Sequence, residues 1–401
     1  MNGSDWSVVK FTMAGHALCH SHELSIPVFI TIWLDIFTTT EAFLGLIVGV
    51  GYAAIGIGAV PSGILSDKYG SNRVVIVALL GMGFGFGLIS ISPNIVVLAL
   101  ALAIWGISAS LYHPAGLSLL SRRIENRSTA FAYHGVAGNV GTVLGPLLTS
   151  ILLIFLPWRS VAALSVIPTL VGISIAFKLP LGEKKAVEKK KNGTAVYREL
   201  YEDTQILVVS GFPIIIAAVL LYGLYYRGTL TFLPQILLDA PMFNQITLFG
   251  YTLNPTQYIY TALLTAGVGG QYAGGRLTDV VKAEYALILA FVLLVICALA
   301  FVPILTTGFI SLIIMCILIG FVIYLTAPIY QTVIAEHAAN GTHGLSYGYT
   351  YLGMFGIGAL GAPLAGTALS YMSTRVLFLA LAGIAGLAGM VSIYLLVWKQ
   401  D

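Results

Sequence analysis

The chain has 401 residues, of which 58% are hydrophobic and only 9% are charged, and its formal net charge is +3. Its mean hydropathy is +0.95, whereas roughly 25% of the residues of a soluble domain are charged. This composition excludes an ordinary soluble domain and predicts a membrane protein with many spans. The three cysteines, Cys19, Cys297 and Cys316, lie in apolar runs without the spacing of a metal site or a disulfide framework.

Twelve apolar segments are long enough, at about 20 residues or more, to cross the hydrocarbon core of a bilayer. Their continuous hydrophobicity favours helices over the short alternating strands of a membrane barrel. The predicted fold is therefore an all-α membrane protein with twelve transmembrane helices. The predicted segments are 8–36, 42–66, 73–92, 94–122, 128–156, 159–179, 206–238, 255–278, 284–304, 308–335, 343–371 and 375–398.

Basic residues are distributed unevenly between the two sides of the membrane. Fourteen lysines and arginines lie in the connections after even-numbered segments, whereas only Arg159, Arg227 and Arg375 fall on the opposite side. Lysine and arginine are enriched in cytoplasmic loops. We therefore expect a multi-pass protein of the cytoplasmic membrane with both termini in the cytoplasm. The first segment is too long for a signal peptide and lacks a small-residue cleavage site, so we expect it to stay in the mature protein.

One long polar connection, 181–203, divides the segments into two sets of six. We predict an N-terminal bundle over 1–180, a basic cytoplasmic linker over 181–203 and a C-terminal bundle over 204–401. Short patterns recur in both sets, so the two halves are predicted to be pseudo-symmetric copies of one repeat. The matching pairs are Gly63 to Asp67 with Gly275 to Asp279, Pro114 with Pro328, and Gly138 to Ser150 with Phe355 to Thr367.

The first segment places ionisable residues where a membrane helix is otherwise apolar. At 100° per residue, His16, His20 and Glu23 fall on one stripe of a helix, whereas His22 points elsewhere. Ionisable groups in membrane helices face the bundle interior or a water-filled cavity, because exposing a charge to lipid is costly. We predict that the stripe lines the space between the halves. It either binds substrate and carries protons, or holds neighbouring helices by hydrogen bonds.

The connection between the second and third segments carries a recognisable motif. It reads GILSDKYGSNR from Gly63 to Arg73, and a shorter copy ends at Asp279. Its spacing of glycines, aspartate and basic residues resembles the signature of the major facilitator superfamily, and this resemblance covers nearly the whole chain. We expect Gly63 to permit close helix approach, Asp67 to pair with a basic residue and Gly70 to allow a tight turn. With Arg73 and Asp279, these residues are predicted to gate rather than to bind substrate.

Four stretches resemble the fosmidomycin-resistance branch of the superfamily. They are GHALCHSHELSIP in the first segment, YHPAGLSLLSRR from Tyr112, GNVGTVLGPLL from Gly138 and YYRGTLTFLP from Tyr225. Relatives in this branch tend to have an acidic residue four positions after an early histidine. Here that position holds His20, and the acidic residue is Glu23. The resemblance implies drug export as one candidate activity.

Two more histidines lie within predicted segments. His113 precedes Pro114 in the fourth segment, where the resemblance implies that it faces the cavity. His134 enters the fifth segment, and the repeat gives it Tyr351 as its counterpart. Because histidine titrates near neutral pH, these side chains are candidates for substrate binding or for proton relay.

Arg227 is the candidate for recognising a negative charge. The repeat places it opposite His20, and neighbouring tyrosines, Tyr226 among them, surround it in the sequence. A planar guanidinium matches carboxylate, phosphate or phosphonate groups. We predict an anionic or zwitterionic small molecule as the substrate. The alternative is a structural role, in which Arg227 lies near the membrane interface or pairs with Glu23.

These features predict a secondary transporter that works by alternating access, coupled to protons, with drug or metabolite efflux favoured. Two alternatives stay open: a divalent metal-ion transporter that uses the histidines and Glu23 of the first segment, and a membrane receptor or enzyme. No GxxxxGK[ST] or HExxH pattern is present, so we expect neither ATP-driven pumping nor enzyme activity. We expect a monomer in the lipid bilayer, without a cofactor, a resident metal ion or a nucleic-acid partner.

Overall fold

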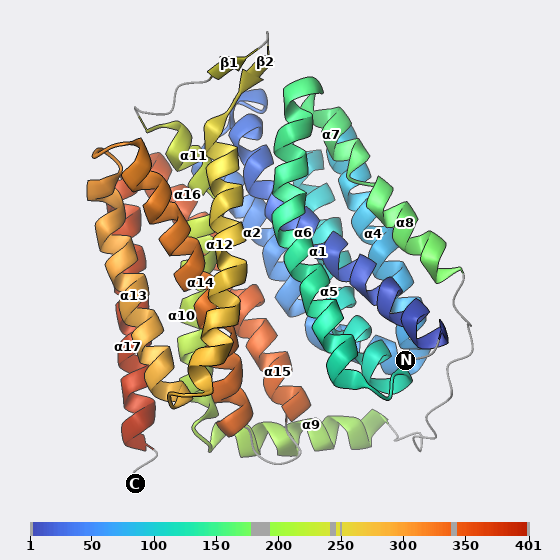
Figure 1. The fold of residues 1–401 in the computed structure, drawn as a ribbon. Helices are drawn as coiled ribbons and strands as arrows, with labels where there is room; N and C mark the ends of the chain where they lie inside the picture. Colours follow the sequence, from blue (N-terminus) through green and yellow to red (C-terminus); the bar gives the residue numbers. More distant parts are fainter. Residues whose placement is uncertain (1–2, 178–192, 241–245, 249–250, 338–342, 399–401) are drawn as a thin grey trace. The chain divides into compact units, whose positions relative to one another are not determined.

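A computed structural model of the chain describes residues 3–177, 193–240, 246–248, 251–337 and 343–398. These residues are almost entirely helical (Figure 1), which confirms the predicted all-α class. One short hairpin is the exception: β1 (Ile246–Leu248) pairs antiparallel with β2 (Tyr251–Leu253). The sequence analysis did not predict this hairpin, because strands of three residues are too short to show an alternating pattern.

The helices follow the predicted segments in order along the chain. Their bounds in the first half are α1 (Gly3–Ile36), α2 (Glu41–Ile57), α3 (Ala59–Tyr69), α4 (Ser71–Ile91), α5 (Ile95–Arg123), α6 (Arg127–Phe155), α7 (Trp158–Leu164) and α8 (Ile167–Ala176). Those that follow are α9 (Gly193–Val208), α10 (Phe212–Leu230), α11 (Leu233–Leu238), α12 (Pro255–Thr278), α13 (Ala283–Ile304), α14 (Phe309–His337), α15 (His343–Tyr351), α16 (Gly361–Tyr371) and α17 (Thr374–Trp398).

Length and hydropathy of the described helices give fewer candidate spans than the twelve predicted segments. In the described part of the chain, nine helices are long and apolar enough to cross a membrane, or ten if α2 and α3, which meet at a 47° bend, form one span. Neither α1 nor α12 is in this set, because polar residues lower the hydropathy along both helices. The predicted count of twelve therefore stays a prediction.

The chain forms two compact units. The first comprises Met1–Lys184, Leu230–Thr261 and Ala362–Tyr371, and the second comprises Lys185–Thr229, Ala262–Gly361 and Met372–Asp401. In the first unit α1 packs against α6, and α4 packs against α5. In the second unit α13 packs against α14 and α17. Residues 181–192 of the predicted linker, 181–203, lie outside the described residues, and residues 193–203 belong to α9.

The helical segment between α15 and α16 changes its hydrogen-bond pattern. Leu352–Ile357 is π-helical and Gly358–Leu360 is a single 3-10 turn. Such π-helical turns occur mostly inside α-helices and frequently at functional sites. A Cβ atom at Gly358 would lie 2.7 Å from the Cα atom of Gly223 in α10. The absence of a side chain at Gly358 therefore lets this irregular segment pack directly on the backbone of α10.

Candidate functional site

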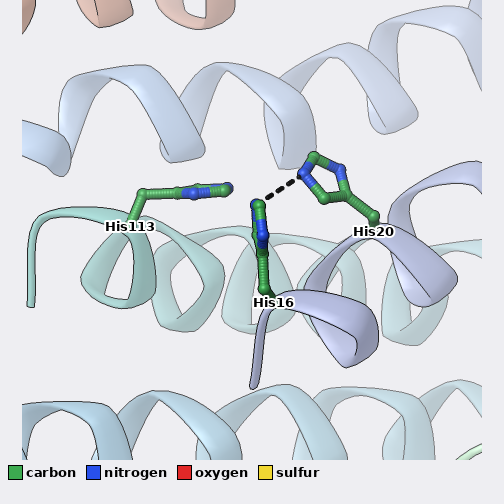
Figure 2. A group of neighbouring side chains, drawn as sticks. All are labelled: His16, His20 and His113. Carbon is green, nitrogen blue, oxygen red and sulfur yellow. Dashed lines mark hydrogen bonds between the residues drawn. The ribbon is translucent and has the colours of Figure 1, made fainter. Parts of the chain in front are cut away.

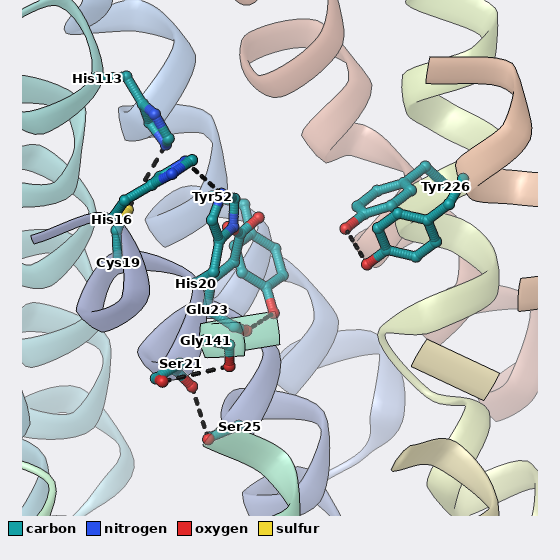
Figure 3. Close-up of polar contacts among 11 residues, drawn as sticks. His16, Cys19, His20, Ser21, Glu23, Ser25, Tyr52, His113, Gly141 and Tyr226 are labelled. Carbon is teal, nitrogen blue, oxygen red and sulfur yellow. Dashed lines mark hydrogen bonds and ion pairs between the residues drawn. The ribbon is translucent and has the colours of Figure 1, made fainter. Parts of the chain in front are cut away.

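Glycines bring α1 and α6 together around the predicted histidine stripe. A Cβ atom at Gly138 would meet the ring of His16, one at Gly141 would meet the backbone of Ala17, and one at Gly145 would meet the backbone of Ser21. Small residues at this spacing let two membrane helices approach closely. Ser21 Oγ also donates a hydrogen bond to the carbonyl oxygen of Gly141 at 3.2 Å (Figure 3). This packing positions the face of α1 that carries the histidines.

The three predicted residues of the stripe form a hydrogen-bonded chain. Glu23 Oε2 lies 3.1 Å from His20 Nδ1, and His20 Nε2 lies 3.1 Å from His16 Nε2 (Figures 2 and 3). Glu23 is only 2% exposed, whereas 22% of the His20 side chain is accessible. The chain therefore joins a buried carboxyl group to the partly exposed imidazole of His20.

His22 lies apart from this chain, as its place on the helical wheel predicted. Its ring stacks on Phe86 with the centroids 3.8 Å apart. Its Nε2 atom donates a hydrogen bond to the carbonyl oxygen of Ser165 at 2.9 Å. His22 therefore helps to hold α1 against other helices of the first unit.

A second group of contacts fixes the ring of His16. Its Nδ1 atom donates to the backbone carbonyl oxygen of His134 at 2.7 Å, and the two rings stack with centroids 3.9 Å apart. Tyr112 donates its only hydroxyl hydrogen to the carbonyl oxygen of Thr12. The Tyr112 oxygen must then accept the Nε2 hydrogen of His134, 3.1 Å away. These bonds set the donor and acceptor nitrogens of both histidines.

His113 approaches the same group from α5. Its Nε2 atom lies 3.7 Å from Cys19 Sγ, and its ring centroid lies 5.2 Å from that of His16 and 5.4 Å from that of His20. One ring nitrogen from each of the three histidines falls within a group 4.8 Å across (Figure 2). Imidazoles at this separation could hold a transition-metal ion such as zinc. The expectation that no metal is resident stays a prediction.

Arg227 has an aromatic environment in the second unit. It is 1% exposed, and its guanidinium carbon lies 5.2 Å from the ring centroid of Tyr226 and 5.7 Å from that of Phe355. These distances are within the range of cation–π attraction. Tyr351, the predicted counterpart of His134, stacks on Phe355 at 5.4 Å, and the hydroxyls of Tyr226 and Tyr324 are 3.3 Å apart. The predicted opposition of Arg227 to His20 concerns two different units and stays a prediction.

The signature motif has the expected ion pair and turn. Asp67 at the end of α3 pairs with Arg122 of α5. Gly70 ends α3 with a φ of 90°, a backbone region that glycine adopts without strain, and α4 begins at the next residue. The expectation for Gly63 is wrong: among the described residues, a Cβ atom there would meet nothing within 4 Å. Gly63 therefore makes no close helix approach in this structure.

The remaining predicted gating residues lie at helix ends. Arg73 is exposed in the first turn of α4. Asp279 follows α12 and lies 3.3 Å from Arg276 in an exposed ion pair. Exposed pairs of this kind contribute little to stability, typically about 0–1 kcal/mol.

Several contacts of the histidine group were not predicted. Tyr52 of α2 donates to the backbone carbonyl oxygen of Glu23 at 3.2 Å, Cys19 lies against His113, and Tyr112 orients His134. Tyr112 and Cys19 directly precede the predicted residues His113 and His20 in the sequence, so they could have been included as candidates. No feature of the sequence pointed to Tyr52, because its contact with Glu23 depends on how α2 packs against α1.

A short run in α15 matches a hydrolase pattern that the sequence analysis passed over. Residues Gly344 to Gly348 read GLSYG, which fits GxSxG. In hydrolases the serine of this pattern sits on a sharp turn between a strand and a helix. Ser346 instead lies within α15 and is fully buried. The run therefore gives no support to hydrolase chemistry.

Comparison with curated proteins shows similarity over part of the chain. A stretch of 173 residues is 28% identical to the multi-drug resistance efflux pump PmrA homolog of Lactococcus lactis subsp. lactis (strain IL1403), covering 41% of this chain and 43% of that protein. Another of 146 residues is 25% identical to the uncharacterized MFS-type transporter YqjV of Bacillus subtilis (strain 168), covering 36% and 35%. The chain thus matches less than half the length of either relative.

Solved structures match over nearly the whole chain. The nucleoside transporter NupG has a TM-score of 0.79 at 12% identity, covering 98% of this chain and all of that one. A D-xylose-proton symporter has a TM-score of 0.77 at 12% identity, covering 96% and 97%. At such low identity, these similarities establish a shared fold.

A family model settles the assignment that the signature motif predicted. The model described as Major Facilitator Superfamily matches residues 15–360, which include the motif from Gly63 to Arg73 and the whole histidine group. The comparisons place the chain among transporters rather than enzymes. The narrower resemblance to the fosmidomycin-resistance branch stays a prediction. The chain belongs to the Major Facilitator Superfamily.

Proposed function

We propose that the protein is a secondary transporter that exports a small organic molecule across the cytoplasmic membrane in exchange for protons. Membership of the superfamily supports transport as the activity. Partial similarity to a multidrug efflux pump homolog supports export as its direction. Exchange for protons is proposed from the residues of this chain itself rather than from its relatives.

One observation carries the proposal. Glu23, a buried carboxyl group within α1, is hydrogen-bonded to His20, which is hydrogen-bonded to His16. Ionisable residues inside membrane spans are rare and mark ion pathways and proton relays, because their burial is costly. Imidazole and carboxyl groups change charge as they bind and release protons. The group could therefore bind a proton from one side and release it to the other during a transport cycle.

The substrate is proposed to be anionic or zwitterionic. Arg227 is the buried cation that supports this, with Tyr226 and Phe355 against its guanidinium. A guanidinium can form two parallel hydrogen bonds with a carboxylate, phosphate or phosphonate. Aromatic rings beside it can contact the apolar part of an organic anion. His113, His134 and Tyr351 complete the proposed substrate-binding or proton-coupling residues.

Alternating access between the two predicted halves is the proposed mechanism. Asp67, with its ion pair to Arg122, and the turn at Gly70 are proposed to form part of the cytoplasmic gate, together with Arg73 and Asp279. We propose a monomer, since the histidine group and the aromatic surroundings of Arg227 belong to one chain. Both of its termini are proposed to lie in the cytoplasm.

Transport by the purified full-length protein in proteoliposomes tests the proposal. Two probes of opposite charge are used: fosmidomycin, which carries a phosphonate, and ethidium, a cation. We expect fosmidomycin to accumulate in vesicles with an acidic lumen, at a clamped membrane potential, because outward proton flow drives its uptake. Equal uptake without the pH gradient would contradict proton coupling. Accumulation of ethidium in preference to fosmidomycin would contradict an anionic substrate.

Divalent-metal transport is a second candidate, because one ring nitrogen each from His16, His20 and His113 lies within a group 4.8 Å across. The same vesicles, loaded with a zinc-sensitive dye, distinguish the two candidates. Zn²⁺ uptake that is lost in His113→Asn, without fosmidomycin uptake, would favour the metal. Absence of Zn²⁺ uptake under every gradient would remove this candidate.

A further inference from the structure

We infer that Glu284, Glu336 and His337 form a binding site for a divalent transition-metal ion such as Zn²⁺, which joins the first turn of α13 to the end of α14. The site belongs to the second unit and shares no residue with the histidine group of the first unit. It does not depend on the proposed function, since an ion held here would be neither the substrate nor the coupling ion. Such a site would depart from the expectation that the protein holds no resident metal ion.

Three side chains of the kinds that bind zinc converge at these two helix ends. One ring nitrogen of His337 and one carboxylate oxygen from each glutamate lie within 4.8 Å of one another. Imidazole nitrogen and glutamate oxygen are both ordinary zinc ligands, and a site with three protein ligands can complete its tetrahedron with water. Glu284 is only 3% exposed, whereas Glu336 is exposed to solvent. Water can therefore reach the fourth position from the side of Glu336.

The hydrogen bonding of His337 leaves one ring nitrogen ready to bind a metal ion. Its Nδ1 atom lies 2.9 Å from the carbonyl oxygen of Val333, which only accepts, so Nδ1 carries the hydrogen. In a neutral imidazole the Nε2 atom then has a lone pair and no hydrogen. This Nε2 atom is buried and has no hydrogen-bond partner among the described residues. Histidines that bind metals almost always have this arrangement, in which the other ring nitrogen donates to a carbonyl or carboxylate oxygen.

The distance between His337 Nε2 and Glu284 Oε1 favours a metal ion over a shared proton. The two atoms are 3.5 Å apart. A protonated imidazole that donated to the carboxylate would bring them to about 2.7–2.9 Å. Two atoms bound to one tetrahedral zinc ion, with bonds of about 2.0–2.2 Å, lie about 3.3–3.5 Å from each other. The observed separation therefore matches two ligands of one ion better than a hydrogen-bonded ion pair.

The charge of the group suits a divalent cation. Two carboxylates beside a neutral imidazole carry two negative charges, and like charges this close oppose each other unless a cation lies between them. Imidazole suits zinc and its neighbours among the transition metals, whereas Mg²⁺ and Ca²⁺ prefer oxygen ligands. Since α13 already packs against α14, one bound ion would fasten two helix ends that are in contact.

Zinc binding to the purified full-length protein in lipid nanodiscs, without a polyhistidine tag and after treatment with a chelator, tests the inference. His113→Asn serves as the starting protein, because it removes one member of the other group that could hold zinc. It should bind one Zn²⁺ ion in competition with a zinc-sensitive dye, and Mg²⁺ in excess should not displace that ion. X-ray absorption of the bound zinc should show a single imidazole ligand, whereas binding at His16 and His20 would show two.

Three further substitutions in the starting protein identify the ligands. Glu284→Gln and His337→Gln should each weaken zinc binding by about 100-fold or more, since loss of even an outer-shell partner typically costs about 10- to 100-fold. Glu336→Gln changes an exposed side chain, so it keeps the test decisive if the buried variants do not fold, and it should weaken binding by at least about 10-fold. Asp279→Asn is the matched control, because this exposed carboxylate near the start of α13 is paired with Arg276 instead. It should leave zinc affinity unchanged.

Zinc should also raise the melting temperature of the starting protein, because an ion that binds the folded state stabilises it, and it should not do so in His337→Gln. Zinc affinity that ignores both Glu336→Gln and His337→Gln, two imidazoles around the bound ion, or displacement by Mg²⁺ would each overturn the site. The outcome is separate from that of the proposed function. A protein that binds zinc through these three residues and does not transport fosmidomycin supports the site and contradicts proton-coupled export of an anion.

Discussion

The two units place their buried charges in different chemical settings. In the first unit Glu23 is hydrogen-bonded to His20, which is hydrogen-bonded to His16, and each imidazole can gain or lose a proton. In the second unit Arg227 lies against aromatic rings and stays positively charged at any physiological pH. Groups that titrate can respond to a proton gradient, whereas a permanent charge can retain a counter-charge. The contrast fits a transporter in which one unit handles protons and the other handles an anion.

The largest expected effect is that of Glu23→Gln. The amide keeps the size of the side chain but does not exchange a proton in the physiological range, so gradient-driven accumulation of fosmidomycin should be abolished. Exchange of labelled for unlabelled substrate, which needs no net proton movement, should persist. Vesicle transport with and without a pH gradient measures both activities. Glu125→Gln, a change at an exposed carboxyl group between α5 and α6, is the matched control, and normal accumulation in Glu23→Gln would exclude Glu23 as the coupling group.

Substitution of Arg227 should act on affinity instead. Hydrogen bonds to charged groups contribute about 1.5–3 kcal/mol, so Arg227→Ala should weaken binding of an anionic probe by about 10- to 100-fold. Arg227→Lys should weaken it less, because the charge remains while the two-pronged geometry is lost. Equilibrium binding of fosmidomycin and the melting temperature are measured together. Unchanged affinity in well-folded Arg227→Ala would remove Arg227 from the site, and loss of folding rescued by Glu23→Gln would show a structural pair.

Substitutions at closely packed glycines disturb the histidine group and the surroundings of Arg227 separately. Gly141→Ala would place a Cβ atom against the backbone of Ala17, so we expect a loss of about 1–3 kcal/mol in stability and an altered pH response. Gly361→Ala would place one 2.7 Å from the nitrogen of Gly228 and 3.0 Å from Arg227 Cβ, and should lower anion affinity instead. Thermal unfolding, pH profiles and binding distinguish the two outcomes.

Gly135→Ala is the control on α6, because a Cβ atom there would meet nothing within 4 Å. It should be neutral or slightly stabilising, since alanine favours a helix over glycine by about 1 kcal/mol. Equal effects of Gly141→Ala and Gly135→Ala would mean that the close approach of α1 and α6 is unimportant for the histidine group.

The smallest expected effect is at the proposed gate, which includes neither the histidine group nor the surroundings of Arg227. Asp67→Asn removes the charge that pairs with Arg122 and should shift the protein toward inward-open states, with a smaller effect for Asp279→Asn. Distances between spin labels on the two predicted halves measure this shift. Neither change should alter the pH midpoints of the histidines. An unchanged distance distribution in Asp67→Asn would contradict a gate at this position.

Periodicity and composition predicted much of this molecule. Continuous apolar runs marked the helices, and the spacing of His16, His20 and Glu23 placed them on one stripe, because both properties are local. The contact between His16 and the carbonyl oxygen of His134 joins residues 118 positions apart. It depends on how α1 packs against α6, which a single segment does not encode. The tautomers follow from that packing and were equally out of reach.

Two glycines also show that the sequence predicts local features better than helix packing. Gly70 was predicted correctly because a turn between two helices is a local feature. Gly63 was predicted to permit close approach and does not, since the motif alone does not say which face of a helix meets a neighbour. Around Arg227, adjacent Tyr226 was found from the sequence, whereas Phe355 and Tyr324 reach the same surroundings from other helices.

The π-helical turn at Leu352–Ile357 sets which face of α16 meets α10 beside Arg227. A π-helical turn holds more residues than an α-helical one, as if one residue had been inserted. If the same residues formed regular α-helix, at about 100° per residue, α16 would rotate relative to α15 by roughly the angle of that extra residue. Gly361, which meets α10 beside Arg227, would then face another direction. Deleting one residue in this turn should disturb the anion site less, because a regular α-helix that is one residue shorter leaves α16 facing nearly as before.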